Sequence, residues 1–205
     1  MSGRRSYLTA LAGIEWFGLI AQLILMLNSG AAPTGELLMR FFTYFTITTN
    51  LLVGVYSLDL LFRPAQPFFS RPSIQTAIVM YITVVGLIYN LILRQLWSPT
   101  GLQAVVDDIL HTAIPVLVIL YWVIWVDARS VQSRAIWRWL LYPAVYTAIV
   151  FVRGAFAHWY PYPFMDLQKL PTATVIRNCV GILGVFLLFS AIFWYWGHKK
   201  ASSAR

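Results

Sequence analysis

Charged residues are scarce in this sequence of 205 residues: 11% are Asp, Glu, Lys or Arg, whereas 60% are hydrophobic. A soluble domain usually carries about a quarter charged residues, because its surface must be hydrated. This composition excludes an ordinary soluble globular protein and makes lipid the expected solvent. The net charge of +8 would suit nucleic acid, but the basic residues are spread between apolar segments and form no patch. We therefore expect no nucleic-acid partner.

Several common sites are also missing. The single cysteine, Cys179, excludes an intramolecular disulfide and a cysteine metal cluster. His158 and His198 do not complete a recognised metal-ligand spacing with His111, so neither a metal nor another cofactor is expected. There is no G-x-S-x-G elbow, P-loop or dinucleotide fingerprint. An enzyme with this sequence would be an unusual one.

Six segments are long and apolar enough to cross about 30 Å of hydrocarbon, which takes roughly 20 residues. Backbone groups in lipid must be hydrogen-bonded within each segment, and the alternating pattern of barrel strands is absent, so helices are expected. The first segment is too long for a signal peptide and contains Glu15 and Gln22, so we interpret it as a span. The prediction is an all-α, polytopic integral membrane protein in which residues 1–205 form one six-helix domain. The predicted spans are 7–27, 41–62, 74–96, 105–126, 139–158 and 172–196.

Basic residues are distributed unequally between the two sides of the predicted membrane domain. Because positively charged loops tend to stay in the cytoplasm, the richer side is predicted to be cytoplasmic, and both termini belong to it. The predicted location is a plasma (inner) membrane that the chain crosses several times. The richer side has Arg4, Arg5, Arg63, Arg71, Arg129, Arg134, Arg138, Lys199, Lys200 and Arg205, and the other has Arg40, Arg94 and Lys169.

Polar residues from five of the six predicted spans fall at one depth, in the outer half of the membrane. A charged group inside a span is costly unless it is paired or hydrated, so each is a candidate functional residue. Only Glu15 is clearly deeper. Such a layer indicates a cavity open to the outer leaflet. Its members are Thr46, Thr48, Thr49, Asn50, Asn90, Arg94, Asp107, Asp108, His111, Arg153, His158, Arg177 and Asn178.

Two interpretations of this layer are open. In the first, Asp107 or Asp108 pairs with an arginine to join helices, and the threonines serve helix packing. In the second, His111 is a general base, because carboxylates three and four residues earlier can reach its ring and fix its tautomer. A hydroxyl and an imidazole on different helices are the minimum of a nucleophile–base pair. Candidates for stabilising an oxyanion are Asn50, Asn90, Asn178 and Arg177.

Three motifs lie in the second span, in the fourth span and between the last two. They are Tyr44-Phe45-Thr46 with the following Ile47-Thr48-Thr49-Asn50-Leu51-Leu52, then Leu110-His111-Thr112-Ala113-Ile114-Pro115, and Trp159-Tyr160-Pro161-Tyr162-Pro163-Phe164-Met165-Asp166. In order and separation they resemble the androgen-induced protein family, which includes the androgen-dependent regulator of tissue factor pathway inhibitor. The resemblance is to its bacterial six-helix branch in particular and covers nearly the whole chain.

The resemblance implies an atypical threonine hydrolase that cleaves fatty acid esters of hydroxy fatty acids. It places the nucleophile at Thr46, with Thr43 as the rival, and the base at His111. The expected partner is a lipid substrate from the membrane, and Arg153 or Arg177 would bind its free carboxylate as a bidentate fork.

Two other functions stay open. A lipid or small-molecule transporter or binding protein would use the same cavity without covalent chemistry, although the related halves typical of secondary transporters are not evident. A structural membrane subunit would pair all its charged residues and leave no cavity.

Overall fold

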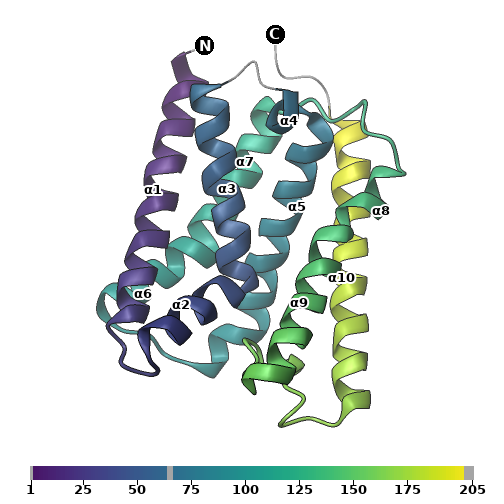
Figure 1. The fold of residues 1–205 in the computed structure, drawn as a ribbon. Helices are drawn as coiled ribbons and strands as arrows, with labels where there is room; N and C mark the ends of the chain where they lie inside the picture. The colour runs from purple at the N-terminus through teal and green to yellow at the C-terminus, as the bar shows by residue number, and fades with distance from the viewer. Residues whose placement is uncertain (1, 64–66, 201–205) are drawn as a thin grey trace.

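The computed structural model describes residues 2–63 and 67–200, and all the regular secondary structure in these ranges is helical (Figure 1). Six helices of this part of the chain are long and apolar enough to cross a membrane, which confirms the predicted fold class. The first three spans are α1 (Ser2–Leu27), α3 (Phe45–Phe62), and α5 (Pro72–Ile88) continued by the π-helical turn η1 (Tyr89–Leu93) and the 3₁₀ turn η2 (Arg94–Leu96). The fourth is α6 (Gly101–Asp108), the π-helical turn η3 (Ile109–Ala113) and α7 (Ile114–Trp125). The fifth is α8 (Ala135–Trp139) with α9 (Leu141–Ala157), and the sixth is α10 (Thr172–Lys199).

Three short elements connect the spans: α2 (Thr34–Thr43), α4 (Pro67–Ser70) and the 3₁₀ turn η4 (Pro163–Met165). The second span begins at Phe45 and not at residue 41, because Tyr44 has an extended backbone that separates α2 from α3. The first N–H groups of a helix have no carbonyl partner within it. Here the Tyr162 hydroxyl accepts hydrogen bonds from the N–H groups of Phe45 (3.0 Å) and Thr46 (3.4 Å). The two candidate nucleophiles therefore lie on different helices.

The bundle is packed unevenly. In the second and third spans, 56% and 61% of the most apolar 18-residue stretch is buried, against 17% in each of the fifth and sixth. The outward surface of α9 and α10 consists largely of exposed apolar side chains, including Val152, Phe156, Leu188 and Ile192. Such a surface suits contact with lipid, where exposed apolar groups carry no penalty.

The start of α1 and the end of α10 lie at the same end of the bundle (Figure 1). Basic side chains at this end bind groups of α7: Lys200 Nζ donates to the carbonyls of Trp122 (2.6 Å) and Val126 (2.7 Å), and Arg4 donates to the Tyr121 hydroxyl. A cation at the C-terminal end of a helix is favourable because the last carbonyls lack partners. Arg205 lies outside the described residues, and the assignment of this end to the cytoplasm stays a prediction.

Helices α5 and α7 approach closely at Gly86. A Cβ atom at this position would lie 3.0 Å from the His111 carbonyl oxygen and 3.1 Å from Pro115 Cγ, and neither a backbone oxygen nor a proline ring yields easily. Pro115 also alters its own helix, because it has no N–H and its ring displaces the carbonyl four residues earlier, that of His111. Asn90 Nδ2 donates to this carbonyl at 3.1 Å. Gly86 and Asn90 together accommodate the irregular turn η3.

Gly86→Ala should therefore destabilise the protein, and Gly184→Ala is the matched control, because nothing lies within 4 Å of a Cβ at Gly184. Overpacking a close contact costs about 1–3 kcal/mol, whereas both variants gain the same helix propensity. We expect a lower unfolding temperature in detergent for Gly86→Ala than for Gly184→Ala. Equal unfolding temperatures would contradict the close packing of α5 on η3.

Candidate functional site

A cavity of about 430 Å³ lies between α3, α5 with η1, α9 and α10. Its lining includes the first residues of α3 and the first turn of α10, and both helices begin in the half of the bundle away from the chain ends (Figure 1). This volume is within the range of small-molecule binding sites. Most of the lining side chains are apolar, among them Phe45, Val85, Leu183 and Phe186. The lining thus suits a hydrocarbon chain. The hydroxyl groups in the lining belong to Thr46, Tyr89, Tyr146, Thr147 and Tyr162.

Of the two candidate nucleophiles, Thr46 lines the cavity. It is the second residue of α3, it is buried, and its carbonyl accepts a hydrogen bond of 2.8 Å from Asn50 Nδ2. Thr43 is the last residue of α2 and does not line the cavity, and its hydroxyl donates to the Met39 carbonyl at 2.6 Å. The placement favours Thr46 over Thr43.

The imidazole of His111 is held by Asp107 and Tyr89. Its Nδ1 lies 2.9 Å from the Asp107 carbonyl oxygen and 3.3 Å from Asp107 Oδ1. Because both neighbours are acceptors, Nδ1 carries the proton in the neutral ring, and Nε2 is left to accept one. The Tyr89 ring stacks on the imidazole at a centroid distance of 3.6 Å, and its hydroxyl donates to Asp107 Oδ2 and accepts from Trp97 Nε1. Orientation, tautomer and one face of the ring are thereby fixed.

Thr46 and His111 are brought to the same region but do not touch. Asn50 Nδ2 donates to the carbonyls of Thr46 and, at 3.3 Å, Leu110, which precedes His111. Tyr89 lines the cavity and covers the imidazole, whereas His111 is not part of the lining. In the described part of the chain no hydrogen bond joins Thr46 to His111. The site thus has a hydroxyl in the cavity wall and an imidazole behind Tyr89.

Other predicted site residues bind elsewhere. Asp108, which was expected to reach His111, turns to Arg94 instead (Arg94 Nη2 to Oδ1, 2.5 Å), and Arg94 also donates to Asn90. Asn178 Nδ2 donates to the Phe164 carbonyl at 2.9 Å and so joins α10 to η4. These contacts link one part of the fold to another. Because Asp108 pairs with Arg94, Asp107 is the carboxylate that contacts His111.

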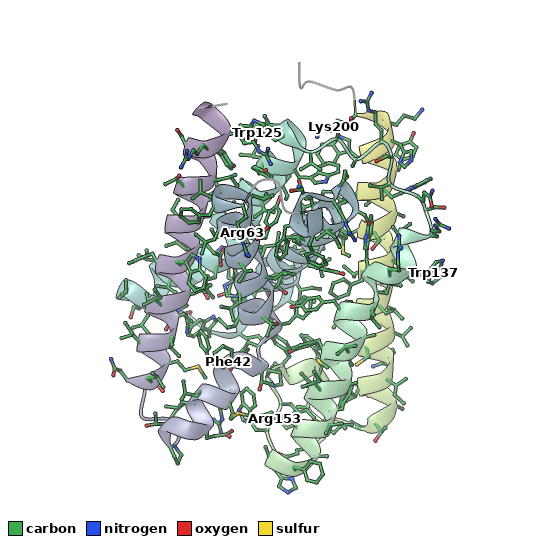
Figure 2. All side chains as sticks on the ribbon, turned by 45° about the horizontal axis from the view of Figure 1, so that its top comes forward. Phe42, Arg63, Trp125, Trp137, Arg153 and Lys200 are labelled. Carbon is green, nitrogen blue, oxygen red and sulfur yellow. The ribbon has the colours of Figure 1, made fainter. Side chains whose placement is uncertain are left out.

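A cluster of Glu36, Arg40, Arg153 and Trp159 joins α2 to the end of α9; we call it the ion cluster. Glu36 accepts hydrogen bonds from Arg40 Nε (2.8 Å) and from Arg153 Nη2 (2.8 and 2.9 Å to its two oxygen atoms). Both guanidinium carbons lie over the Trp159 ring, 4.9 and 5.1 Å from its centroid. Figure 2 shows Arg153 at the end of the molecule remote from Lys200.

The ion cluster contains one of the two arginines that were predicted to bind the carboxylate of a substrate. Arg153 was expected to bind a substrate carboxylate, and here it binds a carboxylate of the chain itself. Arg177, the other candidate, is exposed on α10. Glu36 was not among the predicted site residues, although its position four residues before Arg40 is the spacing of a helical ion pair. The tyrosines Tyr89 and Tyr162 were likewise missed.

No protein-family model, no curated protein and no solved structure matches this chain. The family resemblance drawn from the three motifs therefore stays a prediction.

The ion cluster predicts a loss of stability in acid. Hydrogen bonds from Arg40 and then from Arg153 hold the pKa of Glu36 below its ordinary value. A group with a lowered folded-state pKa contributes stability above its unfolded pKa, about 4.3 for Glu, and this contribution is lost as the pH falls through the lowered value. We expect the unfolding temperature of the native protein to fall with pH in this window. Glu36→Gln should lack this part of the decrease, and identical pH profiles would contradict the pairing.

Proposed function

We propose that this chain is a membrane-embedded ester hydrolase in which Thr46 is the nucleophile and His111 the general base. The observation that carries the proposal is the meeting of two features at one apolar cavity. A threonine hydroxyl lies in the cavity wall, and behind the adjoining Tyr89 lies a histidine whose Nδ1 is fixed by Asp107, with Nε2 left as the basic nitrogen.

The reaction would follow the logic of a nucleophile, a base and an orienting carboxylate. Thr46 Oγ attacks the ester carbonyl carbon while its proton passes to His111 Nε2. The bond to the alcohol oxygen then breaks, and His111 returns the proton to the departing alcohol, which leaves an acyl-threonine. Water attacks this acyl group, gives a proton to His111, and the acid leaves as Thr46 regains the proton. Asp107 stabilises the imidazolium at both stages.

The reaction requires Thr46 Oγ to come within hydrogen-bonding reach of Nε2. Catalytic hydrogen bonds are often long or poorly aligned before the substrate binds, and they tighten in the complex. Tyr89 stands between the cavity and the imidazole, so its ring is the group whose rotation would open the way.

The proposed substrate is a lipid ester with long apolar chains, by resemblance a fatty acid ester of a hydroxy fatty acid. The apolar lining supports an acyl chain in the cavity, and Arg153 or Arg177 would bind the free carboxylate. In this proposal both termini are in the cytoplasm, the domain lies in the plasma (inner) membrane, and the lipid enters from the outer leaflet.

A second candidate function is lipid binding or transport without covalent chemistry. The specific observation in its favour is that His111 is absent from the cavity lining. A purely structural subunit is less well supported: Asp108 and Glu36 do form ion pairs as that reading requires, but the cavity remains.

Labelling of the purified protein in detergent with a fluorophosphonate probe separates these functions. We expect the wild type and Thr43→Ala to be labelled and Thr46→Ala to remain unlabelled. The labelling rate of His111→Ala should fall by roughly 10²–10⁴, the usual contribution of a general base.

Unfolding temperatures of all variants provide the control for folding. If a well-folded Thr46→Ala were labelled as fully as the wild type, Thr46 would not be the nucleophile. A folded wild type that does not react with the probe would favour the lipid-binding function.

A further inference from the structure

The ion cluster carries an unused cationic donor. It contains two guanidinium groups and one carboxylate, an excess of one positive charge. Arg153 Nη2 binds both oxygen atoms of Glu36, whereas Arg153 Nη1 is buried and has no hydrogen-bond partner among the described residues. Leaving a buried donor unpaired is unfavourable, and more so for a charged group. The cluster is therefore suited to accept an additional anionic group.

The ion cluster adjoins the cavity. The Trp159 ring packs edge-on against Tyr44 (5.6 Å between centroids), and Tyr44 packs against Tyr162, which lines the cavity. On α9, Arg153 follows the cavity-lining Tyr146 by seven residues, which places both on one face of the helix and about 10 Å apart along its axis. A chain-like molecule in the cavity thus has a charged site close to its end.

The geometry of the cluster matches an oxyanion. The planar fork of Arg binds carboxylate or phosphate with two parallel hydrogen bonds. Glu36 uses only one arm of this fork: Nη2 donates to both of its oxygen atoms, at 2.8 and 2.9 Å, and Nη1 has no partner among the described residues. Its side chain is 30% exposed and belongs to α2, which is not one of the six spans, so it can turn away without unpacking the bundle. The Trp159 ring lies beneath both guanidinium groups and attracts their positive charge through cation–π contacts.

We propose that the ion cluster is a binding site for the anionic head group of a single-chain lipid, a carboxylate or a phosphate, and that Glu36 is its internal competitor. The head group replaces Glu36 on Arg153, and the acyl chain extends into the cavity. This inference rests on the proposed function, which places an acyl chain in the cavity and a carboxylate on Arg153 or Arg177, and extends it to Glu36 as the competing group. It requires neither Thr46 nor His111 to react.

The test measures lipid binding in non-ionic detergent by equilibrium dialysis, with Thr46→Ala as the background so that hydrolysis is removed. The probes are hexadecanoic acid, its methyl ester, hexadecyl phosphate and inorganic phosphate. Glu36→Gln removes the competitor's charge, and Arg153→Gln removes the fork. Asp127→Asn and Arg129→Gln make the same charge changes in an exposed ion pair outside the ion cluster.

We expect Glu36→Gln to bind the acid and the alkyl phosphate roughly tenfold more tightly, and Arg153→Gln roughly tenfold more weakly, the range of one charge-assisted hydrogen bond. The methyl ester should bind all variants alike, and inorganic phosphate should not bind. If Arg153→Gln does not fold, Arg153→Lys keeps the charge without the fork and should weaken binding of the acid.

Parallel changes for acid and ester would overturn the proposal, as would equal effects of Glu36→Gln and Asp127→Asn. Binding of inorganic phosphate as tight as that of the alkyl phosphate would also overturn it, because the site would then serve a free anion and not a lipid. These outcomes are independent of fluorophosphonate labelling, so the head-group site and the hydrolase can fail separately.

Discussion

Pro115 has no N–H to donate to the carbonyl oxygen of His111 four residues earlier, and the arrangement of the site follows from how that oxygen is satisfied. Asn90 supplies the missing hydrogen bond, and Gly86 allows the oxygen to approach α5. Both contacts come from the same span, so α5 and α7 are held in one register. In that register the π-helical turn presents His111 to Asp107 and to the stacked ring of Tyr89. π-helical turns are frequent at functional sites, and the turn η3 lies where Pro115 lacks an N–H for the regular helical hydrogen bond.

The cavity and the ion cluster are consequences of uneven packing. α3 and α5 are buried on most sides, whereas α9 and α10 pack against them along a narrower face and expose apolar surface outward. The space between the two pairs is the cavity, and Tyr162 connects its wall to the start of α3. At the same end of the bundle, Glu36 and Arg153 join α2 to α9. A lipid with a charged head and an apolar chain has complementary groups in these two places.

Composition and charge were sufficient to predict six spans, because the physical demand of the bilayer acts on whole segments. The positions of Thr46, Asp107 and His111 in one region also followed from depth and from helical spacing. The break at Tyr44 could not be predicted, since the partner that satisfies the start of α3 is Tyr162, more than a hundred residues away. The sequence also could not predict which aspartate contacts His111. Asp107 and Asp108 have similar spacing to His111, and only the packing of the helices decides that Asp107 faces the imidazole.

Glu36 was missed for a different reason. The second span was predicted to start at residue 41, so Glu36 lay outside the predicted spans, although it belongs to the helix α2. Glu15 was predicted to lie deeper than the polar layer; it is fully buried, and neither carboxyl oxygen has a hydrogen-bond partner among the described residues. Its burial shows that a polar residue in a span is not by itself evidence for the site described here.

Photo-crosslinking shows whether the cavity holds a lipid chain. A fatty acid with a diazirine near the middle of its chain would be activated on the purified protein, and the modified residues identified by mass spectrometry. We expect adducts on buried residues of the lining, such as Phe45, Met165 and Phe186, that disappear with excess unlabelled fatty acid. Adducts confined to outward-facing residues such as Phe17, Ile20 and Ile24 of α1, insensitive to competition, would contradict it.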